Sequence, residues 1–416
     1  MTSVVSAHQK SDLPNIGGPR SRINGLTHFP VYPHRTEVSI STRIDYFVGG
    51  EGTHVFELKP DFEDVMNRYE AWWNCAIVDR PLVSIAFGKP RAERQTLLRK
   101  DHVSIRDRWM DTEYIVQTAE TNLRNTVHCA DSLPVAWPNL GPEVFSAFYG
   151  CEMEYGEDTA WSKPILPDLS EESVGKLRLD TNNFYFRKIM EMSDALIEAG
   201  KGKFIVGYTD LHGGGDALAA FRDPQELLID TIDHPIAIKH LCDRITTDFL
   251  RVYDIFHEKL TAAGMPSTTW CPATCRGKFH VPSNDFSCMI SDQAFEEFFV
   301  AGIIRECRHM DRCIYHLDGP QALRYLDRLL DVPEIHAIQW VPGAGHDYWA
   351  DWIKVYQRIQ TRNKALQVLS IPAKDLHRLF TALRPEGVWI SSVTGVSNRQ
   401  EADAVLREIS RWTRRQ

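Results

Sequence analysis

The sequence predicts an α/β protein, a (β/α)8 barrel (TIM barrel) with an N-terminal extension. Two observations predict this fold class: strand-like segments that are apolar almost throughout, and amphipathic helix-like segments between most of them. Strands that are apolar on both faces are typical of a parallel sheet covered by helices. Eight such segments match the strand number of a closed barrel. Ambiguous stretches at 106–127 and 143–200 leave an open, doubly wound sheet as the alternative.

Residues 1–38 are expected to form a flexible N-terminal arm, and 39–416 a single decorated barrel. The first stretch is rich in Pro, Gly, Ser and His and has few apolar pairs. The predicted strands are 81–87, 134–140, 203–210, 267–274, 313–319, 336–343, 367–371 and 388–393. The predicted helices include 61–78, with Trp72 and Trp73 packing on its apolar side, 234–260, 292–310 and 398–415, which begins with Asn398 as an N-cap.

Composition narrows the class of protein. The 416 residues carry a formal net charge of −9 without a basic stripe, so the pattern of a nucleic-acid-binding protein is absent. No signal-peptide-like segment or long apolar run is found, and nine scattered cysteines indicate a reducing compartment. We therefore expect a cytoplasmic protein that contacts neither nucleic acid nor membrane. Its expected partners are a small-molecule substrate and, in a homodimer, a second copy of the chain.

In a barrel, functional side chains gather where strands end and the following loops begin. Asn139 ends one predicted strand, and Gln339 and Trp340 end another. Ser391, Ser392 and Thr394 end the last one. No GxGxxG or GxxxxGK[ST] motif follows any strand, so no nucleotide cofactor is expected. The strand ends instead predict a pocket for a small polar molecule.

The segment TDLHGGGD (209–216) is the most unusual stretch. Asp210 and His212 can bind a metal or act as an acid and a base, and Asp216 is a candidate substrate ligand. The structural alternative is that Asp210 caps the next helix and the three glycines form a turn. We favour the functional interpretation, because a cap requires neither the histidine nor three glycines.

Two further clusters complete the candidate site. Residues 275–287 carry Arg276, Lys278, His280 and Asp285, and the cationic side chains are predicted to bind a substrate carboxylate, although exposed loop charges are common. A CPATC zinc site is disfavoured, because no second cysteine pair follows.

His316 and Asp318 end an apolar strand in YHLDGP (315–320) and point the same way, being two residues apart. They are candidate catalytic residues and candidate ligands of a divalent metal, zinc or another. The alternative is a structural histidine bonded to a neighbouring carbonyl.

The motifs DFSCMISDQAFEEFF (285–299), YHLDGP and AIQWVPG (337–343) together resemble the uroporphyrinogen decarboxylase superfamily, as does the stretch from Trp73 to Phe87. The resemblance covers roughly 65–412. It implies a (β/α)8 barrel and one of two activities: cofactor-free decarboxylation, or methyl transfer from a corrinoid protein to a thiol with zinc.

The chain departs from both branches. The Arg-rich segment of the porphyrinogen decarboxylases is missing, since 88–100 is not equivalent. His316 matches a metal-binding histidine of the methyltransferases, whereas Asp318 stands in place of their cysteine. We expect a decarboxylase-like lyase acting on a small carboxylated or polyhydroxylated molecule that is not a porphyrinogen. The alternatives are a metal-dependent methyltransferase or demethylase with a corrinoid protein, and a non-catalytic ligand-binding barrel.

Overall fold

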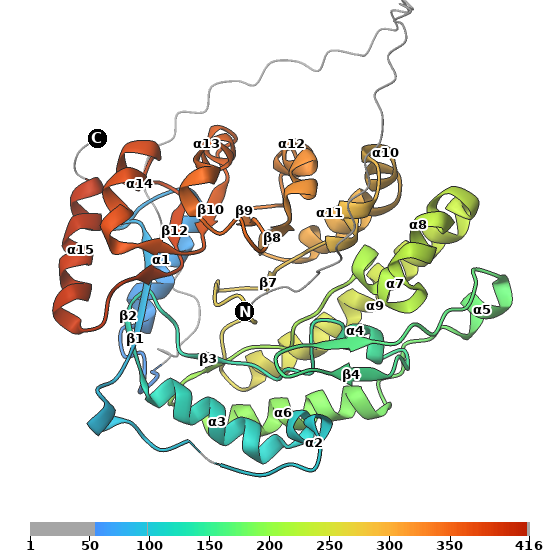
Figure 1. The fold of residues 1–416 in the computed structure, drawn as a ribbon, viewed down its shortest axis with the longest axis horizontal. Helices are drawn as coiled ribbons and strands as arrows, with labels where there is room; N and C mark the ends of the chain where they lie inside the picture. The colour runs from blue at the N-terminus through green and yellow to red at the C-terminus, as the bar shows by residue number, and fades with distance from the viewer. Residues whose placement is uncertain (1–54, 98, 414–416) are drawn as a thin grey trace, which may run out of the picture. The chain divides into compact units, whose positions relative to one another are not determined.

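The computed structural model describes residues 55–97 and 99–413. The predicted arm at 1–38 lies outside the described residues. The fold is α/β, with a central sheet that is mainly parallel and with helices around it (Figure 1). The sheet has the order β2-β1-β12-β10-β9-β8-β7, and β1 and β12, its first and last strands along the chain, are parallel neighbours. The strands are β1 (Leu82–Gly88), β2 (Thr126–Ala130), β7 (Phe279–His280), β8 (Arg312–Asp318), β9 (Ala337–Val341), β10 (Ala365–Val368) and β12 (Val388–Ile390).

Only β2 runs antiparallel in this sheet, against β1. Three smaller sheets accompany the main one. The pair β3–β6 is parallel, with Val135 opposite Ile205. The smaller sheets consist of β3 (Val135–Ala136) with β6 (Ile205–Val206), β4 (Met153–Tyr155) with β5 (Ala160–Ser162), and β11 (Ile371–Pro372) with β13 (Val393–Thr394).

The predicted closed barrel is not shown by the strand pairing. Backbone hydrogen bonds continue from β3 through β6 to the segment around Thr268, where the Tyr208 amide donates to the Thr268 carbonyl at 3.0 Å. Within the described residues, however, no strand ladder joins β6 to β7. The predicted strand 267–274 is wrong: this segment forms a single antiparallel bridge between Ser267 and Cys275, so the chain turns back before β7 begins.

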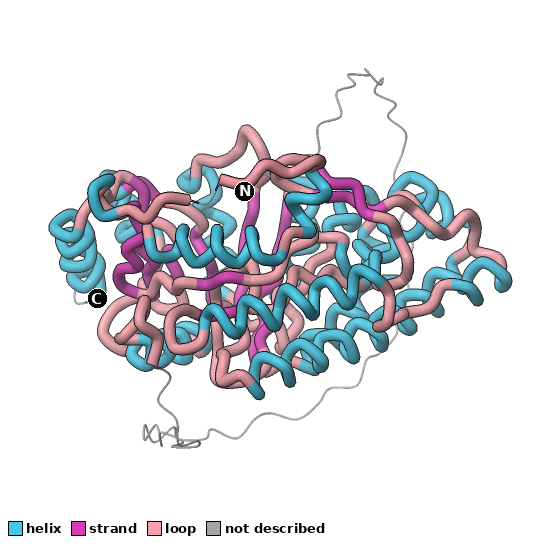
Figure 2. The backbone as a smooth tube through the Cα atoms, turned by 90° about the horizontal axis from the view of Figure 1, so that it is seen from below, coloured by secondary structure: helices cyan, strands magenta, loops and turns pink. Residues whose placement is uncertain are grey.

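The central strands form as expected from their apolar character. All four residues of β10 and all three of β12 are buried, as are Ala337 to Trp340 in β9. A strand buried on both faces needs helices on its flanks. Figure 2 shows helices covering the strands, and Figure 1 places α12, α13 and α14 on the outer side of β8, β9 and β10. The predicted strands 313–319, 336–343 and 388–393 are confirmed with small changes at their ends.

The helices agree closely with their apolar periodicity. Predicted helix 234–260 is α9, and Asn398 accepts a hydrogen bond from the Glu401 amide as an N-cap does. Predicted helix 292–310 is α10 and α11, joined by a π-helical turn at Phe295–Phe299. The helices are α1 (Phe62–Trp73), α2 (Ile105–Met110), α3 (Thr112–Arg124), α4 (Val144–Ala147), α5 (Glu171–Lys176), α6 (Phe184–Gly200), α7 (Gly214–Arg222), α8 (Pro224–Asp233), α9 (Pro235–Ala262), α10 (Asp292–Ala294), α11 (Val300–His309), α12 (Leu326–Leu330), α13 (Ile353–Thr361), α14 (Leu376–Ala382) and α15 (Arg399–Thr413).

Helix α1 anchors the start of the described chain through its aromatic residues. Trp72 and Trp73 are buried, and their indole N–H groups donate to the carbonyl oxygens of Gly387 and Thr274 at 3.0 and 2.9 Å. These bonds explain how two tryptophans can be buried without an unpaired donor. They confirm that the pair serves packing. None of the helices in the described ranges combines the length and apolar character needed to cross a lipid bilayer.

Candidate functional site

Side chains from four parts of the fold meet beyond the carboxyl ends of β6, β7 and β8. We call this set the His/Asp cluster. Parallel strands deliver the groups that follow them to one edge of a sheet, which is where ligands bind in such folds. The cluster consists of Asp210 and His212 after β6, Asp216 in α7, Asp285 after β7, and His316 and Asp318 in β8.

His316 is held by a chain of side-chain amides. Its Nδ1 is hydrogen-bonded to Gln339 Oε1 in β9, and Gln339 Nε2 donates to Gln367 Oε1 at 2.7 Å in β10. Because the Gln339 amide nitrogen is used as the donor, its oxygen must accept, and Nδ1 of His316 therefore carries the proton. The Nε2 lone pair is left free, 4.0 Å from Asp318 Oδ2. The ring of Trp270 lies edge-on at 5.4 Å from that of His316.

His212 is held between two carboxylates. Its Nε2 lies 3.0 Å from Asp210 Oδ1, and its Nδ1 lies 3.6 Å from Asp216 Oδ2. The Ser283 hydroxyl, 3.0 Å from Nδ1, donates to Asp216 Oδ2 at 2.8 Å, and the Phe286 amide donates to Asp216 Oδ1. Burial alone would lower the pKa of His212, but the carboxylates outweigh burial and hold this pKa well above its ordinary value.

Asp285 lies between the two histidines. Its carboxylate has ligand atoms within 4.8 Å of His212 and Asp216 on one side, and within the same distance of His316 and Asp318 on the other. Partial desolvation by the surrounding protein, followed by the charges of Asp216 and Asp318, raises the pKa of Asp285 to about 6, although the side chain remains exposed to solvent. Each group of three offers one imidazole nitrogen and two carboxylates, a donor set suited to a divalent transition metal.

The charge of the cluster is strongly unbalanced. Four carboxylates face two histidines, and throughout the described ranges their ion-pair partners are those histidines alone. Asp285 accepts no hydrogen bond from any described residue. Carboxylates gathered without lysine or arginine repel one another unless protons or metal ions compensate. The cluster therefore favours a cation over an anionic group.

Arg276 and Lys278, predicted to bind a substrate carboxylate, lie elsewhere. Both precede β7 and so lie at the amino end of that strand, opposite to the cluster. Arg276 pairs with Glu63 at 3.2 Å, and Lys278 pairs with Asp254 at 2.7 Å. The prediction took their loop to follow a strand. Because 267–274 is no strand, the loop instead leads into β7.

The other predicted substrate ligands are separated from the cluster or already paired. His280 is buried against Tyr208 at 3.1 Å, and burial, with the charge of His212, lowers the pKa of His280 to about 3. Asn139 accepts a hydrogen bond from the Gly141 amide at 2.8 Å. Trp340 is fully buried and packs against Trp352. Gln339 does reach the cluster, as a support for His316.

Three participants were missed by the sequence interpretation. Ser283 joins His212 to Asp216, and Gln367 fixes the Gln339 amide. A polar residue inside the buried strand ALQV was the available signal for Gln367. The third, Glu306, is buried in α11 and its carboxyl oxygen approaches the position of Gly213. Nothing in the amphipathic helix around it distinguishes Glu306 from a surface acid.

The glycines of TDLHGGGD serve close packing. Helix α7 begins without a side-chain cap, so Asp210 is not its cap. A Cβ at Gly215 would come within 2.5 Å of Asn284 Oδ1, and Gly214 has φ of +49°. These glycines allow the start of α7 to lie against the loop after β7, which brings Asp216 close to Asp285.

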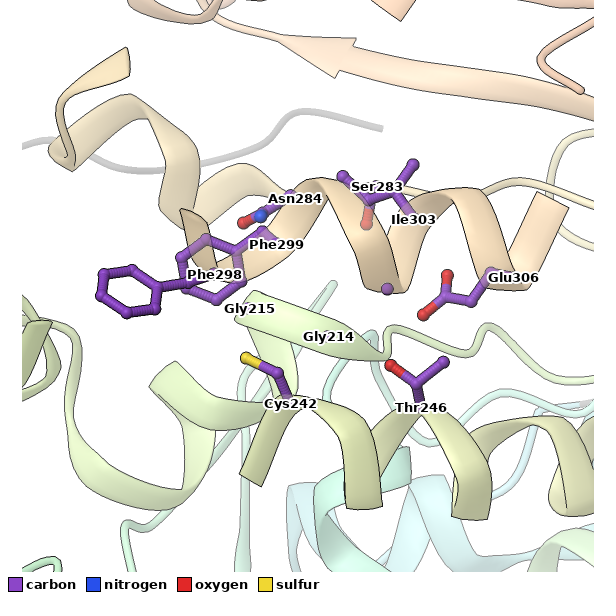
Figure 3. A pocket seen from close by; sticks show the side chains of 11 residues that line it. Gly214, Gly215, Cys242, Thr246, Ser283, Asn284, Phe298, Phe299, Ile303 and Glu306 are labelled. Atoms are coloured by element: carbon purple, nitrogen blue, oxygen red, sulfur yellow. The ribbon is translucent and has the colours of Figure 1, made fainter. Parts of the chain in front are cut away.

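A small cavity with a mainly apolar lining adjoins Ser283, the residue that contacts His212 and Asp216 (Figure 3). It has room for about one water molecule and is lined by Ser283, Asn284, Thr246 and Glu306 among others. The amide of Asn284 and the hydroxyl of Thr246 have no hydrogen-bond partner among the described residues. Burial, followed by the charge of Asp216, raises the pKa of Glu306 to about 8. The cavity thus places a protonated acid near the cluster at neutral pH.

Comparison with known proteins shows the fold. No protein-family model matches the chain, and no curated sequence matches it. Among solved structures, the chain is similar to a methyltransferase from Methanosarcina mazei, with a TM-score of 0.50 and 10% sequence identity. The similarity covers 83% of this chain and 98% of the methyltransferase. The chain therefore shares the fold of a methyltransferase over nearly that protein's full length.

Proposed function

We propose that the protein is a metal-dependent methyl-transfer enzyme of the uroporphyrinogen decarboxylase superfamily, built on a (β/α)8 barrel and working with a corrinoid protein. The observation that supports it best is the triad of Asp285, His316 and Asp318, with the histidine held so that Nε2 faces the carboxylates. The fold shared with a methyltransferase supports the same class.

The donor set fits a metal, although a different one from a thiolate-bound zinc. Two thiols lie near the triad: Cys271 is beside the Gln339 amide at 3.7 Å, and Cys288 donates to the Asp318 carbonyl. Burial raises the pKa of the Cys271 thiol to about 12 and that of Cys288 to about 11, so both remain protonated. Nitrogen and carboxylate donors favour Mn²⁺, Fe²⁺ or Zn²⁺ with open positions for an oxygen ligand.

A divalent cation, when bound, would polarise an oxygen of the small-molecule substrate as a Lewis acid. The side chains of this protein orient the ligand groups of the site. Gln339 and Gln367 fix the ring of His316, and Trp270 lies against that ring. In the proposed reaction the methyl group would pass from the substrate oxygen to the Co(I) form of the partner protein's corrinoid. The O–CH3 bond would break as the electron pair of Co(I) forms the bond to carbon, and the oxygen would take a proton from solvent. Solvent reaches this point because Asp285 is exposed.

The test is methyl transfer between a methylated small molecule and a corrinoid protein, followed by the corrinoid absorbance. Wild-type protein loaded with Mn²⁺ or Zn²⁺ should turn over, and protein stripped with a chelator should recover only on adding metal back. The Asp318→Asn variant should lose most activity, whereas Asp254→Asn, a carboxylate variant outside the cluster, should keep it. Full activity of the stripped protein, or of Asp318→Asn, would contradict the proposal.

A decarboxylase-like lyase is the second candidate, and one observation favours it. His212, with its pKa raised by Asp210 and Asp216, can supply the proton that a decarboxylated carbon needs. The unbalanced negative charge of the cluster argues against a polycarboxylate substrate. Release of carbon dioxide without methyl transfer would favour the lyase. A ligand-dependent rise in melting temperature with neither product would favour a non-catalytic barrel.

A further inference from the structure

We propose that the cluster has a second cation position, formed by His212, Asp216 and Asp285, so that Asp285 bridges two divalent metal ions. The first ion is the one assigned above to Asp285, His316 and Asp318, and this inference rests on that proposed function. The result is a centre with two adjacent cations in place of one.

The geometry of the two triads supports the shared carboxylate. Both contain Asp285, and in each the ligand atoms lie within 4.8 Å of one another. A carboxylate has two oxygens and can therefore offer one to each cation. Metal ions about 3.5–4 Å apart that share a ligand of this kind are a recurrent catalytic arrangement in proteins.

The two histidines are supported in the same manner. Each has one ring nitrogen beside a polar partner: Nδ1 of His316 beside Gln339, and Nε2 of His212 beside Asp210 at 3.0 Å. The other nitrogen of each ring faces a carboxylate of the cluster, Asp318 at 4.0 Å and Asp216 at 3.6 Å. Nδ1 of His212 also contacts the Ser283 hydroxyl at 3.0 Å, and the cation would take the place of that contact. Partners of this type orient histidine ligands in metal sites. The arrangement appears on both sides of Asp285.

The surroundings of His212 are short of positive charge. Asp210 Oδ1 is buried and lies 3.0 Å from His212 Nε2, and Nδ1 of the same ring lies 3.6 Å from Asp216 Oδ2. One imidazole thus faces two carboxylates, which leaves an excess of negative charge. A divalent cation held by His212 would add positive charge next to these oxygens.

Charge balance favours two ions over one. The cluster holds four carboxylates, those of Asp210, Asp216, Asp285 and Asp318, and in the described part of the chain none of them forms an ion pair with lysine or arginine. Two divalent ions carry four positive charges, which equals the four negative ones. A single ion at the His316 side would leave Asp210 and Asp216 compensated by His212 alone.

The experiment measures bound metal directly. The full-length protein is stripped with chelator, saturated with Mn²⁺, passed through a desalting column and analysed by elemental mass spectrometry and low-temperature electron paramagnetic resonance. Wild type should retain two Mn²⁺ per chain with the spectrum of an exchange-coupled pair. His212→Asn and His316→Ala should each retain one uncoupled ion. Asp285→Asn should bind both ions at least about tenfold more weakly, and Asp254→Asn should behave as wild type.

The outcomes separate the two proposals. One Mn²⁺ in wild type that His212→Asn leaves unchanged would overturn the second position and leave the proposed function intact. No retained Mn²⁺ in any variant would overturn both. Circular dichroism checks that each variant folds, and where His212→Asn does not, the wild-type stoichiometry and spin coupling decide the question on their own.

Discussion

Charged side chains are paired at the amino end of strand β7 but are in excess of their partners at its carboxyl end. At its amino end, Lys278 pairs with Asp254, which also lies 2.7 Å from His309. At its carboxyl end, Asp285 faces His212 and His316 and accepts no hydrogen bond from a described residue. One chain segment of about ten residues thus supplies both a self-compensated ionic network and an excess of carboxylates. The charges at the amino end are paired within the protein, whereas the excess at the carboxyl end is what the proposed cations would compensate.

Among these variants, loss of His316 should change metal affinity the most, and it tests whether the carboxyl end of β7 binds metal. His316→Ala removes the only nitrogen ligand of its triad, so we expect its Mn²⁺ affinity at that position to fall more than about 100-fold, beyond the usual effect of a supporting residue. Isothermal titration calorimetry on stripped protein measures the change. An affinity within threefold of wild type would mean that the carboxyl end does not bind metal through this residue.

Glu306 tests whether a further carboxyl group near the cluster is held protonated by burial and by the charge of Asp216. Its pKa is raised from 4.5 to about 8, so the folded protein binds a proton that the unfolded chain releases. This contribution to stability is complete below pH 4.5 and is lost as the pH rises to about 8.

Glu306→Gln removes the titration at nearly constant volume. The variant should gain on the order of 3 kcal/mol over wild type at pH 7, and almost nothing at pH 4.5. Urea unfolding at both pH values measures the gain. A difference between variant and wild type that does not change with pH would show that folding does not raise the pKa of Glu306.

Gln339 tests whether the cluster depends on its supporting residues, because it holds the ring of His316 but is not itself a proposed metal ligand. Gln339→Leu should leave the fold intact but free the ring of His316, so we expect a fall in metal affinity of about 10- to 100-fold. Gln339→Glu keeps an acceptor for Nδ1 and should restore most of the affinity. The calorimetric titration used for His316→Ala serves here as well. Equal affinity of the Leu and Glu variants would exclude an orienting role.

The amino end should give the smallest effect. Arg276→Ala removes an exposed ion pair with Glu63, and such pairs contribute roughly 0–1 kcal/mol. We expect unfolding free energy to change within that range and Mn²⁺ binding to stay unchanged. A loss of metal or substrate binding in this variant would show that the two ends of β7 communicate, contrary to the separation described above.

Local patterns were sufficient for much of the fold. Continuous apolar runs predicted β8, β9 and β12, and helical periodicity predicted α9 and α11, because these signals need only neighbouring residues. The two-residue repeat of a strand also placed His316 and Asp318 on one side. The segment 267–274 was mistaken for a strand, because an apolar run alone does not reveal that the chain turns back at Cys275.

The sequence by itself determined which residues could act as ligands: the histidines and carboxylates after predicted strands were identified from their chemical type and position. Only the tertiary structure decided which of them meet. Asp285 lies between His212 and His316 because β6, β7 and β8 end on the same side of the fold, and Lys278 is excluded because it precedes β7. The physical reason is that such contacts join residues up to about a hundred positions apart, whose distances are set by strand order and by the packing of helices, not by local sequence.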